Sequence, residues 1–333
     1  MIKIKLSTPS PELSVLRQTP SSKGVWGNCQ FFLNTNIKEC DFWVIYEGLS
    51  KMESVRCPQR NTVFITAEPP SIKEYEQEFL EQFTTVITSH RKIRHRNIVY
   101  TQQGYPWHIG RRVSNDDGMQ ITKDYDKLKA IKRFKKNRTL SVISSNKDFT
   151  EGHKKRLEFV MRLKEHFGSH IDVFGRGIRE IGDKWGAIAD YKYHVVLENS
   201  SYMDYWTEKL ADAFLGGAYP FYFGCPNLAD YFPRGSYTAI NIDNFNDCST
   251  TIENTIKNKQ YERSIKERCE ARKLILEKYN LFPMIAEFCN KSRLVNNKAK
   301  VTIKPEDTFT AKHRLRDSIR RFVNRLTGDE TEL

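Results

Sequence analysis

Residues 191–224 read YKYHVVLENSSYMDYWTEKLADAFLGGAYPFYFG, and this stretch decides the fold expected for the chain. Its segment 193–197 is short and rich in β-branched and aromatic residues, which is typical of a buried parallel strand. Thr207 can cap the helix that follows, and a glycine pair can end that helix before a second strand over 219–223. The stretch therefore predicts one βαβ unit with a polar loop at the carboxyl end of its first strand, where open α/β sheets bind ligands.

The polar loop and the first helical turn carry groups that suit a sugar nucleotide. Lys209 lies where the helix dipole and the unpaired N–H groups favour an anion such as phosphate. The carboxylate of Glu208 would repel phosphate but accepts hydrogen bonds from ribose hydroxyls. Asn199 and Tyr205 add neutral groups that can reach phosphate oxygens. A capped surface helix with a solvated Glu–Lys pair would have the same spacing, so these residues alone leave both interpretations open.

The segment 198–224 resembles the signature of the α1,3/4-fucosyltransferases of glycosyltransferase family 10, in their bacterial type. That signature has E-N-S, a tyrosine, T-E-K, an apolar helix and a strand with G-x-x-P, and its spacing is intact here. The segment INIDNF at 240–245 resembles the family's continuation as well.

The resemblance implies a fold and a donor substrate. The fold is α/β with the GT-B architecture, in which two Rossmann-like domains face each other across a catalytic cleft. The donor is GDP-fucose, and the loop and helix entrance described above would bind it through Asn199, Tyr205, Glu208 and Lys209.

A second basic residue is expected to bind the donor diphosphate. A strand over 139–144 leads into a helix, and Arg156 lies early in that helix, near the carboxyl edge of the sheet. The family has an arginine in this helix that contacts the diphosphate, and Arg156 matches it by register, with Lys154 and Lys155 as alternatives. A guanidinium fork suits paired phosphate oxygens better than an ammonium group does.

Glu68 is the candidate catalytic base. It follows an expected strand over 62–66 and precedes two prolines, so it sits on a stiff loop at the carboxyl edge of a sheet. The resemblance implies the role, because the family has a glutamate in a T-G-E-N segment after the equivalent strand; here Ala67 and Pro69 replace the glycine and the asparagine. Alternatively, Glu68 caps a helix that the capping-box spacing predicts from Ser71 onward.

The segment YTQQGYPWHIG at 100–110 is dense in aromatic residues and glycine. Trp107 and His108 are candidates for a sugar-stacking wall that binds the acceptor, because aromatic faces pack on the apolar faces of sugar rings. Packing of Trp107 in the core and a structural, hydrogen-bonded His108 are the competing interpretations.

Composition narrows the function classes. Lys and Arg exceed Asp and Glu by 13, which points to a polyanionic partner: nucleic acid, an anionic membrane or a nucleotide diphosphate. Since no nucleic-acid-binding motif accompanies the charge, nucleic acid is not expected. The seven cysteines are dispersed, no export signal or membrane-spanning run is visible, and no cluster of metal-ligand residues occurs. These features predict a cytoplasmic protein with reduced thiols and no metal cofactor.

The order of expected strands and helices indicates three parts. We expect an N-terminal Rossmann-like acceptor domain over 1–138, which ends in a lysine-rich, solvated linker. A Rossmann-like donor domain is expected over 139–290, and a basic amphipathic tail over 291–333. The tail places apolar residues on one helical face and arginines around the rest, which is typical of a helix on the anionic inner face of a membrane, as in a peripheral membrane protein. A terminal helix docked on the first domain is the alternative.

Together these features predict an inverting glycosyltransferase that moves L-fucose from GDP-fucose to a hydroxyl of a glycan or glycolipid containing N-acetylglucosamine or glucose, in α1,3 or α1,4 linkage. Such a reaction belongs to the synthesis of surface polysaccharide or lipopolysaccharide. The nearest alternative keeps the GT-B fold and uses another nucleotide sugar. A non-catalytic basic protein that binds nucleic acid or membrane is the alternative from a different class.

Overall fold

The computed structural model describes residues 1–9, 15–114, 118–144, 151–292 and 297–310, and it divides into two compact units. Unit 1 comprises the described residues within Met1–Leu13, Cys29–Tyr100 and Arg293–Leu333, and unit 2 those within Ser14–Asn28 and Thr101–Ser292. The chain thus passes into unit 2 at Thr101, whereas the expected domain boundary was at 138. The acceptor and donor roles assigned to the domains stay predictions.

Unit 1 is built on a parallel sheet with the strand order β3-β1-β4-β6-β7-β8. Its central strand β4 is FWVIY, apolar on both faces, as a strand buried within a parallel sheet should be. Phe64 on β6 packs against Phe79 and Phe83 in the core beside the sheet. The elements of this unit are β1 (Ile2–Ser7), β3 (Cys29–Leu33), β4 (Phe42–Tyr46), β5 (Glu53–Cys57), β6 (Thr62–Ile65), α1 (Gln77–Leu80), β7 (Thr85–Thr88), β8 (Ile98–Tyr100) and β16 (Ala299–Ile303).

The helix expected from Ser71 is wrong over its first half. The structure has only the short helix α1, and residues between Ser71 and Glu76 form a turn and an irregular segment. Glu306, distant in sequence, accepts a hydrogen bond from the Glu76 N–H at 3.0 Å and pairs with Lys73 at 2.8 Å. These tertiary contacts hold the segment in place and override the local capping pattern.

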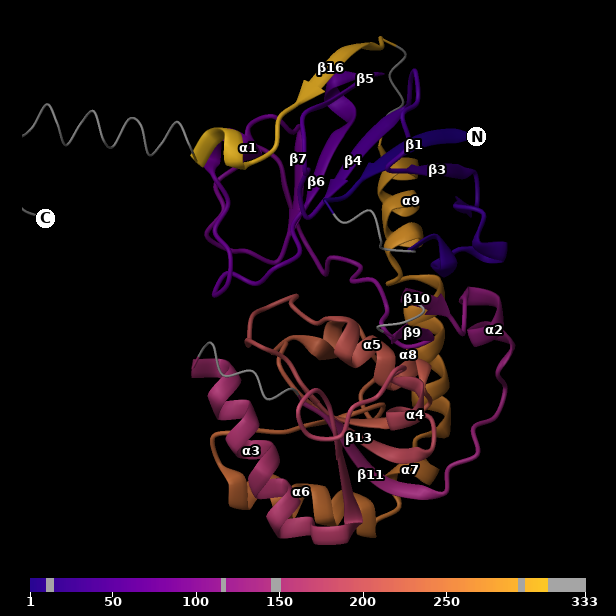
Figure 1. Ribbon diagram of the computed structural model, residues 1–333, viewed down its shortest axis with the longest axis vertical. Coiled ribbons are helices and arrows are strands. Elements are labelled where there is room, and N and C mark those ends of the chain that lie inside the picture. Colours follow the sequence, from indigo (N-terminus) through magenta and orange to yellow (C-terminus); the bar gives the residue numbers. More distant parts are fainter. Residues whose placement is uncertain (10–14, 115–117, 145–150, 293–296, 311–333) are drawn as a thin grey trace, which may run out of the picture. The chain divides into compact units, whose positions relative to one another are not determined.

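The expected tail begins too early. Residues 299–303 form β16, which pairs antiparallel with β5 and lies beside it in Figure 1. Val301 and Ile303 of this strand are buried in the core of unit 1. The amphipathic segment from 311 onward, on which the expected membrane helix depends, lies outside the described residues.

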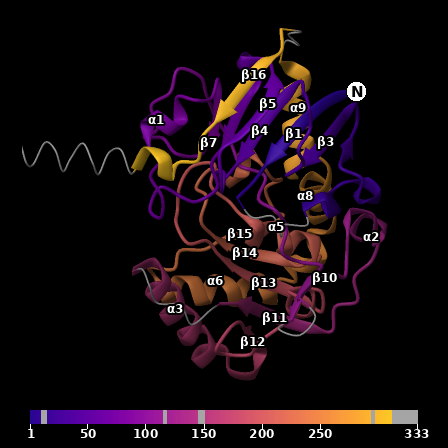
Figure 2. The same ribbon diagram turned by 45° about the horizontal axis from the view of Figure 1, so that its top comes forward.

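Unit 2 contains a second parallel sheet, with the order β12-β11-β13-β14-β15. The helices α3 and α6 pack on one face, where Phe159 and Ile252 meet Val195 of β13 in one core cluster (Figures 1 and 2). The helices α5 and α8 pack on the other face around Val196 and Phe214. Since neighbouring residues of β13 point to opposite faces, the strand is buried on both sides.

The elements of unit 2 are β2 (Val25–Trp26), β9 (Arg111–Ser114), β10 (Gly118–Ile121), α2 (Tyr125–Ala130), β11 (Arg138–Ile143), α3 (Glu151–Phe167), β12 (Ile171–Phe174), α4 (Trp185–Ile188), β13 (Tyr191–Leu197), α5 (Glu208–Leu215), β14 (Tyr219–Phe223), β15 (Thr238–Ala239), α6 (Phe245–Lys257), α7 (Gln260–Arg263), α8 (Ile265–Glu277) and α9 (Leu281–Lys291). The βαβ unit expected over 191–224 is present as β13-α5-β14. The expected α/β class, with a parallel sheet in each of two units, is confirmed.

The lysine-rich segment before β11 is only in part the solvated linker expected from its composition, because Phe134 and Lys136 are half-buried while Lys132, Arg133 and Lys135 are exposed. Lys136 donates hydrogen bonds to the carbonyl groups of Ile188 at 3.2 Å and of Gly216 at 2.7 Å. The ring of Phe134 packs against Gly217, where an added Cβ would lie 2.4 Å from the ring. The segment therefore packs against the carboxyl end of α5. Burial lowers the pKa of Lys136 to about 7.

This lowered pKa predicts a pH-dependent stability. Below about pH 7 both the folded and the unfolded state carry the Lys136 charge, and the folded state bears the full cost of burying it. Between about 7 and the ordinary value of 10.5 only the unfolded state keeps the proton, so stability rises with pH, by up to about 1.4 kcal/mol per pH unit. Lys136→Met removes this group, so the variant should lose that part of the slope in urea unfolding measured across the same pH range. Identical slopes for the two proteins would contradict the assignment.

Candidate functional site

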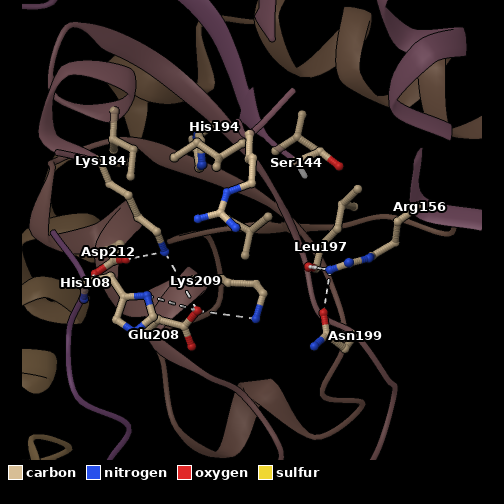
Figure 3. Close-up of a pocket in the computed structure, with 15 residues that line it drawn as sticks. His108, Ser144, Arg156, Lys184, His194, Leu197, Asn199, Glu208, Lys209 and Asp212 are labelled. Carbon is tan, nitrogen blue, oxygen red and sulfur yellow. Dashed lines mark hydrogen bonds and ion pairs between the residues drawn. The ribbon is translucent and has the colours of Figure 1, made fainter. Parts of the chain in front are cut away.

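A cavity of about 520 Å³ opens at the carboxyl edge of the unit 2 sheet, and all of its walls come from this unit. The ends of β11 and β13 supply Ser144 and Asn199, and the turn after β12 supplies Arg176. Helices α3 and α5, the loop before β9 and the segment from Lys184 into α4 supply the rest of the wall (Figure 3). Its further charged and imidazole side chains are those of His108, Arg156, Lys184, His194, Glu208, Lys209 and Asp212.

The entrance of α5 is organised by a buried carboxylate. Thr207 caps the helix, and its hydroxyl accepts the Lys209 N–H. The fully buried Glu198, directly after β13, accepts the Thr207 N–H at 2.8 Å and the Thr207 hydroxyl at 2.7 Å. Burial raises the pKa of Glu198, and the nearby charge of Lys209 opposes this rise. Glu198 thereby fixes the loop between β13 and α5, a role that the sequence did not reveal.

The ammonium group of Lys209 lies between two carboxylates. Its Nζ is 3.5 Å from Glu198 and 3.4 Å from Glu208. Burial by itself lowers the pKa of Lys209, but the charges of Glu208 and Glu198 outweigh it, so the pKa is raised and the amine stays charged. The same attraction keeps Glu208 ionised, because Lys209 lowers the pKa of this carboxyl against the effect of its burial. An ionised carboxylate can only accept hydrogen bonds, and the contact of Glu208 with ribose hydroxyls stays a prediction.

Asp212, one helical turn after Glu208, ties the loop before β9 to α5. Its Oδ1 accepts the N–H groups of His108 at 3.0 Å and Ile109 at 2.9 Å. Its Oδ2 accepts from Lys184 at 2.8 Å, and Lys184 also lies 3.8 Å from Glu208 (Figure 3). The buried Asp212 and the half-buried Lys184 together fix the positions of His108 and Glu208 in the cavity.

Arg156 lies in the cavity with Asn199, as the resemblance implied. One guanidinium nitrogen donates to the Asn199 side-chain oxygen at 2.5 Å and contacts the Leu197 carbonyl at 3.4 Å (Figure 3). The buried Nε of Arg156 has no hydrogen-bond partner among the described residues. The competing Lys155 is exposed and pairs with Asp243, and the donor-binding role of Arg156 stays a prediction. A buried donor without a partner is costly, and an anionic ligand would remove that cost.

His108 lines the same cavity as these residues. Its ring nitrogen is 3.7 Å from Glu208, and burial together with nearby Lys184 lowers its pKa well below the usual value, although Glu208 opposes this. His108 is therefore a neutral imidazole placed among the candidate donor-binding residues rather than at a separate acceptor wall.

Two aromatic candidates do not line the cavity. Trp107 is 2% exposed in the core of unit 2, and its carbonyl accepts from the buried Arg17. Its ring has no face exposed to a sugar, so the prediction that Trp107 stacks on the acceptor is wrong. A large aromatic ring gains more stabilisation from burial in the core. Tyr205 is buried as well, with its ring 5.9 Å from that of Tyr105.

Glu68 belongs to unit 1, where it follows β6 at the carboxyl edge of that sheet. It is half-buried, and its carbonyl accepts from the Nε2–H of His90 at 2.6 Å. A second carboxylate, Glu47, follows the neighbouring strand β4; burial and then the charge of Glu68 raise the pKa of Glu47. The helix that Glu68 was to cap does not form at Ser71, which removes the capping interpretation. The catalytic role stays a prediction.

Among the described residues, no group of three or more His, Cys, Asp or Glu side chains is arranged to hold a metal ion. The acidic pair in the sequence Asp124-Tyr125-Asp126 has structural roles. Asp124 caps α2, and Asp126 accepts the Ser21 N–H.

None of the described helices is long and apolar enough to cross a membrane.

The part of the chain that forms unit 2 resembles known proteins. Residues 133–304 match the family model described as glycosyltransferase family 10 (fucosyltransferase), C-terminal part. Human α-(1,3)-fucosyltransferase 4 is 38% identical over 104 residues, which are 28% of this chain and 18% of that protein. α-(1,3)-Fucosyltransferase B of Drosophila melanogaster is 24% identical over 257 residues, 70% of this chain and 51% of that protein. The chain thus spans less than a fifth of the human relative and about half of the fly relative.

A crystal structure of an α1,3-fucosyltransferase with GDP aligns with 84% of this chain and 92% of its own, at 16% identity and a TM-score of 0.46.

Proposed function

The chain belongs to glycosyltransferase family 10, and from this premise we propose that it transfers L-fucose from GDP-fucose to a hydroxyl of a glycan. The observation that carries the proposal is the unit 2 cavity, which brings Arg156, Asn199, Glu208 and Lys209 together at the carboxyl edge of a parallel sheet. These groups combine an unpartnered guanidinium donor, an amide and an ionised carboxylate, which is the chemistry that a diphosphate and a ribose require.

The proposed reaction is a single displacement that inverts the anomeric carbon. The acceptor hydroxyl oxygen bonds to that carbon from the face opposite GDP, while the bond from the carbon to the diphosphate oxygen breaks and its electron pair leaves with GDP. Glu68 takes the hydroxyl proton, a step that contributes about 10²–10⁴-fold when a base is well placed. Arg156 and the entrance of α5 stabilise the charge that develops on the diphosphate, and fixed cations of this kind can replace a divalent metal.

The acceptor and the setting are further parts of the proposal. An α1,3 linkage is supported by the names of the similar proteins, and an α1,4 linkage stays open beside it. The acceptor is proposed to be N-acetylglucosamine or glucose in a surface polysaccharide or lipopolysaccharide, reached in the cytoplasm. Another nucleotide sugar is the competing donor, because Arg156 and Glu208 would hold any ribose diphosphate.

The donor site can be tested with neighbouring basic residues of α3. Arg156→Ala should weaken GDP binding about ten- to a hundredfold in calorimetry, because a charge-assisted hydrogen bond to phosphate is lost. Lys155→Ala removes the same charge one residue away, from a side chain that pairs with Asp243 at the surface, and should leave the affinity unchanged. Equal affinities for both variants, or a larger loss for Lys155→Ala, would refute the assigned site. Titration with GDP-fucose, GDP-mannose and UDP-galactose identifies the donor.

The base can be tested separately from the donor site. Glu68→Gln keeps the shape of the side chain and removes its proton affinity, so turnover should fall by about two decades or more while GDP-fucose affinity stays the same. Glu74→Gln, on an exposed residue of the same connection, is the matched control. Turnover at the wild-type level in Glu68→Gln would assign the role to another carboxylate, with Glu47 as the first to examine.

Association with an anionic membrane through the basic segment beyond 310 is also proposed. Phe309 lies against Phe79 of the unit 1 core at 6.4 Å between ring centroids, so a deletion should begin after Thr310 to spare the fold. Removal of this segment should abolish flotation with anionic vesicles without reducing transfer to a water-soluble acceptor. Unchanged flotation would favour a tail that docks on the protein.

A further inference from the structure

The cations assigned to the cavity already have partners. Lys184 contacts Asp212 at 2.8 Å and Glu208 at 3.8 Å, and Lys209 lies within 3.5 Å of two carboxylates. Arg156 directs one terminal nitrogen to the Asn199 oxygen and the Leu197 carbonyl, and its buried Nε has no partner among the described residues. Most of the hydrogen-bond donors on these cations are therefore already paired with groups of the protein.

The charges of this group also offset one another. Its carboxylates are those of Glu198, Glu208 and Asp212, and its cations are those of Arg156, Lys184 and Lys209. Counted as ionised, the two sets cancel. A nucleoside diphosphate carries negative charge on both of its phosphates. A site with no net charge that also removes water from those phosphates would bind the ligand weakly. Anion binding at this site calls for a further cation that no carboxylate neutralises.

Arg176 meets this requirement. It lines the cavity and is exposed, and its side chain makes no hydrogen bond or ion pair with any residue that the structure describes. It lies between two glycines in the turn that follows β12, at the carboxyl edge of the sheet where Ser144 and Asn199 also lie. The guanidinium is thus free for a ligand.

The backbone that carries Arg176 is held firmly. Gly175 has a φ of +136° and approaches the Ser144 carbonyl so closely that an added Cβ would lie 1.6 Å from that oxygen. The Gly175 N–H donates to the Arg179 carbonyl at 2.8 Å, and the Ser144 N–H donates to the Phe174 carbonyl at 2.8 Å. A free side chain on a fixed turn can reach a ligand at little cost in backbone order.

Arg179, in the same turn, shows the contrast. Its guanidinium pairs with Asp172 at 3.3 Å and lies over the ring of Phe174 at 4.7 Å. Arg179 is therefore held by contacts within the protein, whereas Arg176, three positions earlier, lines the cavity without a partner among the described residues.

We propose that Arg176, which lines the same cavity as Arg156, binds the diphosphate of the nucleotide sugar and neutralises the charge that develops on the leaving group. The planar fork of the guanidinium suits paired phosphate oxygens. This inference rests on the proposed function for the identity of the ligand, but the assignment concerns any nucleoside diphosphate in this cavity.

The test compares variants of the two arginines in the full chain. Arg176→Ala should weaken GDP binding about ten- to a hundredfold in calorimetry, the loss expected for a charge-assisted hydrogen bond. It should leave guanosine binding unchanged, because guanosine has no phosphate. Arg176→Lys should recover part of the loss, and Arg179→Ala should bind GDP as the wild type does. Thermal unfolding of each variant establishes that the fold is intact.

Three results would overturn the assignment: unchanged GDP affinity in Arg176→Ala, an equal loss for guanosine, or an equal loss in Arg179→Ala. Failure of the proposed function is distinguishable from these. If the wild type binds UDP but not GDP, and the affinity depends on Arg176, the donor is wrong and the role of Arg176 stands. If the wild type binds GDP and Arg176→Ala binds it equally well, only the role of Arg176 falls.

Discussion

The buried ion group at the entrance of α5 is the constraint on which the rest of the candidate site depends. Burying a single carboxylate is expensive, and a pair of opposite charges offsets the cost only when its geometry and its hydrogen bonds are complete. Glu198 meets this condition through Thr207 and Lys209. Because these bonds fix the loop after β13, the cap of α5 and the position of Glu208 follow from them. The residues that follow β11 and β13 line the cavity beside this loop.

The same constraint explains which parts of the site could be predicted from sequence. The residues of one contiguous βαβ unit, such as Asn199, Glu208 and Lys209, lie together because strand, loop and helix form locally. Arg156 was found through the register of a neighbouring helix. Lys184, Asp212 and Arg176 reach the cavity from other turns or from deeper in the helix, and none of them was identified as a ligand-binding residue from the sequence, although Arg176 belongs to the segment IDVFGRG at 171–177, which resembles a strand and turn of the family. The signals were present but weak: Asp212 is four residues after Glu208 on one helical face, and Arg176 follows a strand at the ligand-binding edge.

The errors of sequence reasoning share one physical cause, which is contact between segments far apart in the chain. The helix expected from Ser71 is shortened by Glu306, and the polar segment before β11 is partly buried by α5. Trp107 was a candidate ligand wall by composition and is core by packing. The strands expected in the two parallel sheets, by contrast, were largely correct, because short buried runs of β-branched and aromatic residues are typical of parallel strands, as in β6 and β13.

The path of the chain through the two units has a consequence for biosynthesis. Unit 2 is nearly contiguous, since most of it lies between Thr101 and Ser292, whereas unit 1 takes its strand β16 from residues 299–303. A ribosome therefore delivers the whole of unit 2 before β5 can find its antiparallel neighbour. Through that interval β5 has no partner strand and Val55 lacks its neighbour Val301, so it is in unit 1 that premature release or a pause in translation would expose aggregation-prone surface.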